Sequence, residues 1–226
     1  MKKASQFFSV KEKDAVEKAV VEAERKTSCE ICPIVATSSG RYDRAEDIFG
    51  LLIALSAVSV AWIFFQEVRP AQGKWGGGYA WALGLFPILG IFISGFILGS
   101  TAATYAPVLK LPFLMRKEMR EEVDRSATAA FHQFRMRKTQ QGVGILIYIS
   151  LFEHMVRIDG DDAVKAKLDQ SDWDGVRDGI IQGIQQRRAC EAFCEAIAKC
   201  GELLSRFSPI QPGDRNELPN ELHLID

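Results

Sequence analysis

The residues with the greatest capacity for chemistry lie between Glu153 and Asp162. Asp159, Asp161 and Asp162 form a dense group of acids near a predicted strand end, and loop carboxylates of this kind can ligate calcium or magnesium. The segment lacks the twelve-residue EF-hand pattern, so a solvated turn is the competing interpretation. Glu153 and His154 form a candidate catalytic acid–base pair. Adjacent residues of an extended strand point to opposite faces, so the pair could cooperate only where a turn bends them together.

The cysteines offer a second possible chemistry. Cys29 and Cys32 form a CxxC pair, and Cys190 and Cys194 could complete a set of four zinc ligands. The CxxC pair, however, falls on a short apolar strand, where its two thiols face opposite sides. Buried structural cysteines are therefore favoured. With Cys200 the total is five, and an odd number in a cytoplasmic domain indicates free thiols.

Other classes of site find no support in the sequence. Gly76, Gly77 and Gly78 are followed by no Lys-Ser or Lys-Thr pair, so they do not make a phosphate-binding loop. No serine or cysteine nucleophile motif is present. The formal net charge of -1 gives no electrostatic case for binding nucleic acid.

Two uncharged apolar runs dominate the middle of the chain, Ile48 to Phe65 and Tyr79 to Gly99. About 18 apolar residues are enough to indicate a helix that crosses a bilayer. The runs therefore predict an inserted two-helix transmembrane hairpin over 48–100, with helices at about 48–65 and 79–99. Small residues could let the helices pack closely, although glycine is also simply common in membrane helices. The candidates for helix packing are Gly95, Gly99, Ala54 and Ala61.

Basic residues near the membrane ends predict the orientation of this hairpin. Arg69 and Lys74 lie in its loop, against six basic residues on the opposite side. The excess places both termini in the cytoplasm of a multi-pass inner-membrane protein, with the lipid bilayer as a partner. The six basic residues opposite the loop either touch anionic lipid headgroups or form a solvated face. The six candidate membrane-interface residues are Arg41, Arg44, Lys110, Arg116, Lys117 and Arg120.

The polar parts of the chain predict one α/β domain. Strand 29–36 has no partner in its own segment, so we expect it to join a hairpin of strands over 142–159, in a sheet with helices on both faces. The domain would be discontinuous, comprising 1–47 and 101–210, followed by an extended tail over 211–226. Four helices are expected in this domain. The first begins at Ser9, the second spans 113–139, the third begins at Ser171, and the fourth runs from about Arg187 to Phe207.

The segment from Thr139 to His154, TQQGVGILIYISLFEH, resembles the central strands of the TPM domain. Val16 to Ile34, the Asp-Trp-Asp at 172–174 and the tail NELPNEL are also similar to parts of that family, in particular its small membrane-bound members. The resemblance implies a three-layer α/β/α sandwich with a small central sheet. For some soluble relatives it also implies acid phosphatase activity, calcium binding or photosystem II repair. Where those relatives carry Asp-Asp-Arg, this chain has Phe152, Glu153 and His154.

Two functions follow as expectations. The first is a membrane-anchored, cytoplasm-facing TPM-like domain that acts as a binding or scaffold module, with a protein partner or a second copy of itself. The alternative, by resemblance alone, is a divalent-metal-assisted acid phosphatase that uses calcium or magnesium. A transport subunit is disfavoured, because ion paths usually place polar groups inside the membrane.

Overall fold

The computed structural model describes residues 3–65, 84–134, 144–168, 170–211 and 218–226. The chain divides into two compact units. Residues 1–40 and 116–226 form the first, which we call the α/β domain, and residues 41–115 form the second, which we call the helical hairpin.

The α/β domain is built on a four-stranded sheet of order β3-β2-β1-β4. β1 (Glu30–Ala36) lies parallel to β2 (Gly144–Ser150), so the predicted pairing of strand 29–36 with the later strands is confirmed. β2 also pairs with β3 (Met155–Gly160) in antiparallel orientation, as expected for a hairpin. β4 (His223–Ile225) lies parallel to β1 on its other side, so part of the tail expected to be extended adds a short edge strand.

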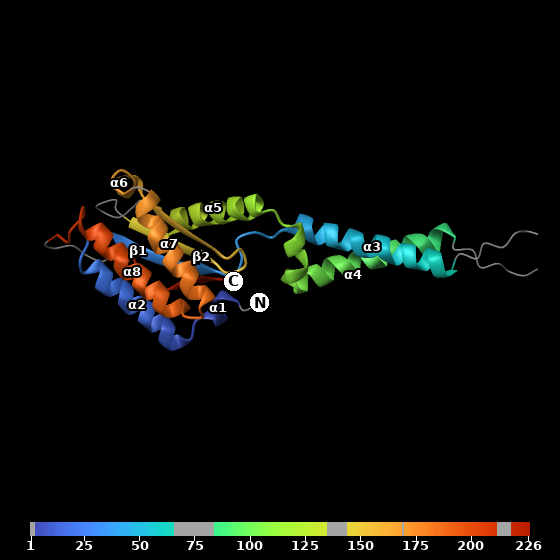
Figure 1. The fold of residues 1–226 in the computed structure, drawn as a ribbon, viewed down its shortest axis with the longest axis horizontal. Coiled ribbons are helices and arrows are strands. Elements are labelled where there is room, and N and C mark those ends of the chain that lie inside the picture. Colours follow the sequence, from blue (N-terminus) through green and yellow to red (C-terminus); the bar gives the residue numbers. More distant parts are fainter. Residues whose placement is uncertain (1–2, 66–83, 135–143, 169, 212–217) are drawn as a thin grey trace, which may run out of the picture. The chain divides into compact units, whose positions relative to one another are not determined.

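Helices cover both faces of this sheet (Figure 1). One face packs against α2 (Val10–Glu24), α7 (Gln170–Gln185) and α8 (Ala189–Ser205). The other packs against α5 (Arg116–Gln133). Two short helices, α1 (Ala4–Phe7) and α6 (Asp162–Lys165), complete the domain.

The strand sequences explain this layering. Every residue of β1 and β2 is buried, because each strand sends alternate side chains into two separate cores. Ile31 and Ile145 point to the core beneath α2, α7 and α8, whereas Ile34 and Leu146 point to the core beneath α5. On α2 the predicted capping box is present, with Ser9 and Glu12 each accepting a hydrogen bond from the other's backbone N–H.

The helical hairpin contains α3 (Asp43–Phe65), α4 (Leu85–Tyr105) and the 3-10 helix η1 (Pro107–Phe113). Both α3 and α4 are long enough and apolar enough to cross a membrane. α3 begins at Asp43, before the predicted residue 48. Its first turn contains acidic residues, which are favourable at a helix N-terminus, but the prediction followed only the apolar residues and therefore started too late. α4 continues past 99 to Tyr105, and the predicted start at 79 lies outside the described residues.

Small residues line the contact between α3 and α4. A Cβ added to Gly99 would lie 2.9 Å from the Cα of Gly50, and one added to Gly95 would lie 3.0 Å from the Cα of Ala54. Such spacing leaves no room for larger side chains and lets the two backbones approach closely. Ala61 is also buried, near the end of α3.

Candidate functional site

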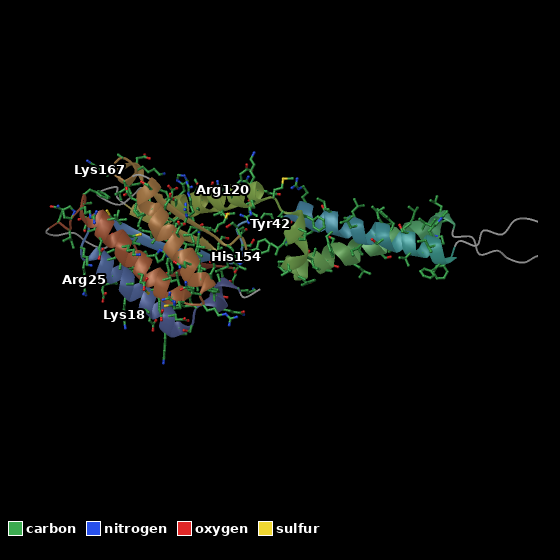
Figure 2. All side chains as sticks on the ribbon, in the orientation of Figure 1. Lys18, Arg25, Tyr42, Arg120, His154 and Lys167 are labelled. Carbon is green, nitrogen blue, oxygen red and sulfur yellow. The ribbon has the colours of Figure 1, made fainter. Side chains whose placement is uncertain are left out.

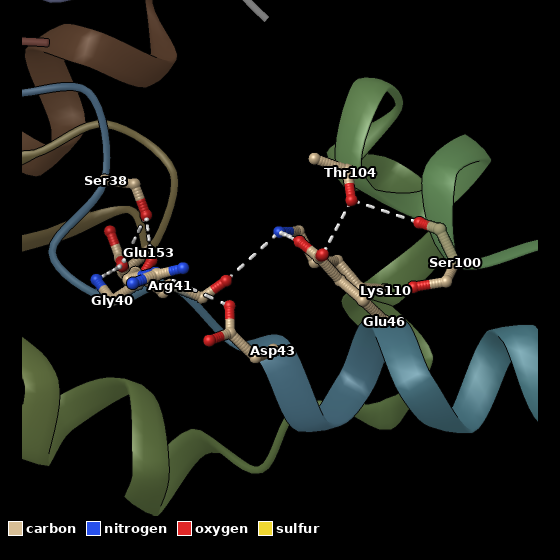
Figure 3. A network of polar contacts seen from close by, with 9 residues as sticks. All are labelled: Ser38, Gly40, Arg41, Asp43, Glu46, Ser100, Thr104, Lys110 and Glu153. Atoms are coloured by element: carbon tan, nitrogen blue, oxygen red, sulfur yellow. Dashed lines mark hydrogen bonds and ion pairs between the residues drawn. The ribbon is translucent and has the colours of Figure 1, made fainter. Parts of the chain in front are cut away.

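The ends of β1 and β2 meet at a buried carboxylate, Glu153, in the turn before β3. Beyond the strands the ladder continues, since the Leu151 N–H donates to the Ala36 carbonyl at 2.9 Å. The Glu153 side chain is 5% exposed. It accepts a hydrogen bond from the Ser39 N–H at 2.9 Å. It also accepts one from the Gly40 N–H at 3.3 Å (Figure 3).

Two hydroxyls also bind this carboxylate. Ser38 Oγ donates to Glu153 Oε1 at 3.2 Å, and Ser150 Oγ donates to Oε2. The carboxylate thus fixes the loop that follows β1 to the end of β2. Its oxygens are occupied by donors of its own domain.

A second layer of hydroxyls lies beside Glu153. Ser39 Oγ lies 2.8 Å from Ser150 Oγ and 3.1 Å from the Tyr148 hydroxyl, and Ser126 Oγ of α5 donates to the Ser39 carbonyl at 3.0 Å. Burial raises the pKa of Tyr148. Ser150 is 1% exposed, so it is poorly placed to act as a nucleophile on a dissolved substrate.

His154 lies differently from its neighbour Glu153. It is exposed and adopts a left-handed backbone conformation with φ of 53°, which ends the turn and starts β3. The structure therefore places one member of the candidate acid–base pair inside the domain and the other at its surface. This arrangement suits a clamp at Glu153 better than proton transfer between the two.

The three aspartates after β3 have structural partners or lie at a helix start. Asp159 forms an ion pair with Lys165 at 2.7 Å. Asp161 caps α6 by accepting from the Val164 N–H at 2.9 Å, and burial raises the pKa of this carboxyl. Asp162 occupies the exposed first turn of α6.

Calcium or magnesium would need several converging oxygens, six or more in the case of calcium. Across the described ranges, no group of three or more His, Cys, Asp or Glu side chains could hold a metal ion. Near α6, Asp159 and Asp161 are instead engaged by Lys165 and by the Val164 N–H.

The cysteines are free thiols. Cys29 and Cys32 contribute to the two different cores, as the strand pattern predicted. Burial, and then the nearby Glu24, raise the pKa of Cys32 to about 12, and burial raises that of Cys200 to about 12. These thiols stay protonated and serve as small apolar side chains.

The six basic residues predicted to lie at the membrane interface have different surroundings. Lys110 is 7% exposed and pairs with Glu46 at 2.5 Å, while also donating to the Arg41 carbonyl at 3.4 Å (Figure 3). Glu46 also accepts from Thr104 Oγ1 at 2.7 Å. Lys110 thus braces η1 against α3. The exposed residues of the set are Arg41, Arg44, Arg116, Lys117 and Arg120.

A cleft of about 550 Å³ lies along β3, between α5 and α7. Arg120 of α5, Arg157 of β3 and Arg177 of α7 all line it, together with His154. Figure 2 labels Arg120 and His154. Sequence reasoning placed Arg120 at the membrane and gave no role to the other two arginines. The three arginines lie on three separate elements, so no local spacing in the sequence could reveal that they share one cleft.

Comparisons with known proteins agree with this fold. A family model described as TPM domain matches residues 113–203, which include α5, β2, β3, α7 and most of α8. A solved structure with a similar fold is the NMR structure of BA42 protein from the psychrophilic bacterium Bizionia argentinensis. It has a TM-score of 0.56 and 18% identity, with 99% of each chain covered. The comparison with curated proteins finds no match. The segment 113–203 of this chain is thus similar to a TPM domain, and the likeness to BA42 concerns the fold.

Proposed function

We propose that this protein is a membrane-anchored binding module, in which the helical hairpin holds the TPM-like α/β domain at the inner membrane. The observation that carries the proposal is the exposure of apolar side chains on the hairpin. Only 17% of the apolar window of α3 and 11% of that of α4 is buried within the protein. Ile63, Phe64 and Phe86 are 74%, 77% and 85% exposed. An apolar surface of this extent is unfavourable in water and favourable in lipid.

The interior of the α/β domain favours binding over hydrolysis. The carboxylate of Glu153, at the position of the family's acidic turn, is buried and holds the loop after β1. The Asp159 carboxylate is engaged by Lys165. The domain instead offers an open cleft beside β3. A protein partner or a second copy of the chain suits such a module, and the basic residues predict that the domain faces the cytoplasm.

Alkaline carbonate extraction of membranes tests the anchoring step. We expect the full chain to remain in the membrane pellet. The double substitution Val60→Arg and Ile93→Arg adds one charge to the exposed side of each apolar helix, and we expect it to release the chain. A matched control is Val10→Arg, at a position on α2 that is 75% exposed. If the unsubstituted chain is extracted like a peripheral protein, the anchoring proposal is wrong.

Crosslinking in native membranes, followed by identification of the neighbours, tests the binding step. Recovery of a defined protein neighbour or of a crosslinked homo-oligomer supports a binding module. Phosphate release by the purified chain that is abolished by Glu153→Gln or Asp159→Asn, in variants shown by circular dichroism to stay folded, would instead favour the phosphatase alternative and contradict our proposal.

A further inference from the structure

We infer that the cleft beside β3 binds an extended acidic peptide segment of a partner protein, which adds to the sheet as a further strand. This inference rests on the proposed function, because it assigns the binding surface of the module. Three observations carry it: the unpaired edge of β3, the positive charge of the cleft and the apolar wall on one side.

The first observation is the strand edge. In the described part of the chain, β3 pairs with β2 alone and ends the sheet. The cleft is lined by five consecutive residues from His154 to Ile158. Side chains of consecutive strand residues alternate between faces, so a cleft that touches all five lies along the backbone edge.

The register identifies which backbone groups face that cleft. The Asp161 N–H donates to the Gly144 carbonyl, so this pair is of the hydrogen-bonded type. Hydrogen-bonded and non-hydrogen-bonded pairs alternate along two antiparallel strands. Counting back by two from Asp161, Asp159 and Arg157 therefore also direct their backbone N–H and C=O groups to β2. Val156 and Ile158 direct theirs to the open edge. A peptide in an extended conformation can pair with these groups, as in known cases of strand addition.

The second observation is charge. Three arginines and one acid, Asp124, lie in the lining, which leaves an excess of two positive charges among these four residues. Arg157 lies 3.4 Å from Asp124, and Arg177 lies 2.7 Å from Asp174 and 2.9 Å from Asp178 of its own helix, so these two arginines already have acidic partners. Arg120 makes no ion pair with any described residue. An exposed guanidinium group without an ion-pair partner in the described residues favours a carboxylate from a bound molecule.

The third observation is the difference between the two walls. On the α7 side, Trp173 and Ile181 belong to the core or pack against it, next to the side chains of Val156 and Ile158. On the α5 side lies Arg120. An added strand also alternates its side chains, so the cleft suits a segment with apolar residues at every second position and acidic residues between them.

The test uses the full chain in nanodiscs of neutral phosphatidylcholine and a capped, fluorescein-labelled seven-residue peptide of alternating glutamate and valine. Fluorescence anisotropy measures binding. A matched peptide with lysine in place of each glutamate should bind at least tenfold more weakly. Hydrogen exchange with residue resolution should show new protection at the amides of Val156 and Ile158, since their N–H groups gain partners.

Two substitutions test the two parts of the interaction. Val156→Pro removes an N–H that the sheet does not use and should weaken binding about tenfold or more, while Val156→Thr keeps that N–H and should not. Arg120→Glu should also weaken binding about tenfold, in contrast to Arg125→Glu on the same helix, which lies outside the lining. Two independent variants keep the test informative if one of them fails to fold.

Four results would overturn the inference. One is the absence of peptide binding. Another is binding that is indifferent to both Val156→Pro and Arg120→Glu. The third is binding of inorganic phosphate that needs Arg120 but not the Val156 N–H, which would indicate a small-anion site. A native partner that crosslinks at another face of the domain would also remove this inference, while leaving the proposed membrane-anchored binding function intact.

Discussion

The Glu153 clamp gives a sharp prediction about stability. Glu153→Ala removes the acceptor for the backbone N–H groups of Ser39 and Gly40 and for the hydroxyls of Ser38 and Ser150. Glu153 is 5% exposed and Ser150 is buried, whereas Ser38, Ser39 and Gly40 are half-buried. We expect the α/β domain to lose much of its stability.

The magnitude follows from the donors left without an acceptor. A buried donor that loses its partner costs about 1–3 kcal/mol. The two hydroxyls have other acceptors, since Ser38 Oγ also donates to the Gly40 carbonyl at 2.9 Å and Ser150 Oγ lies 2.8 Å from Ser39 Oγ. The two backbone N–H groups therefore set the scale. The expected loss in the free energy of unfolding is about 3 kcal/mol. Glu153→Gln keeps the shape and one acceptor oxygen, and about 1–2 kcal/mol is expected.

Urea unfolding followed by tryptophan fluorescence measures this effect. Trp173 is buried in the α/β domain, and the other three tryptophans, Trp62, Trp75 and Trp81, can be replaced by phenylalanine. For a slope of about 2 kcal/mol per molar urea, a loss of about 3 kcal/mol lowers the midpoint by about 1.5 M. The matched control is Glu121→Ala, an exposed residue of α5, where the change should stay within about 0.5 kcal/mol.

The outcome that refutes this reasoning is specific. If Glu153→Ala unfolds within about 0.5 kcal/mol of the unsubstituted chain, the carboxylate does not hold the loop after β1. If Glu153→Gln is as damaging as Glu153→Ala, the negative charge matters more than the hydrogen bonds. Either result would reopen the question of what Glu153 does.

Two further predictions concern other parts of the chain. Gly99→Ala should destabilise the α3–α4 pair by about 1–3 kcal/mol in an SDS titration followed by circular dichroism, because the new Cβ meets rigid backbone. Gly90→Ala, where no atom lies within 4 Å of an added Cβ, should have no such cost, and equal effects would contradict the packing argument. Burial above all raises the pKa of Glu24 from 4.5 to about 8, so the folded state keeps a proton that the unfolded state has lost. The free energy of unfolding should therefore fall as the pH rises from about 5 to 8. The urea midpoint of the unsubstituted chain should fall over the same range, and the urea midpoint of Glu24→Gln should not show this dependence on pH.

Sequence patterns predicted the parts of the fold that depend on local signals. The apolar, β-branched character of β1 and β2 indicated strands buried on both faces, and the absence of a local partner for β1 predicted its pairing with β2. The capping box at Ser9 and Glu12 marked the start of α2. These features were readable because each depends on residues close together in the chain or on a strong hydrophobic pattern.

Other features had no local signal. β4 has only three residues, His223–Ile225, and it is a strand because the edge of β1 offers hydrogen bonds, which the tail sequence does not reveal. Apart from Ser150, the hydrogen-bond donors to Glu153 lie more than 110 positions earlier in the chain, at 38–40. The sequence marked Asp161 as one of a group of acidic residues. Its role as the N-cap of α6 could not be predicted, because α6 has only four residues and gives no clear helical pattern.

The parallel pairing of β1 with β2 has a consequence for biogenesis. The two strands are separated in the chain by the whole helical hairpin. If the hairpin spans a membrane, as we propose, the strands can meet only when the polypeptide returns to the side of the membrane that it left. A molecule that crosses the bilayer once, or three times, has its sheet halves in different compartments and cannot close them. Under the proposed anchoring, completion of the sheet therefore requires an even number of membrane crossings between β1 and β2.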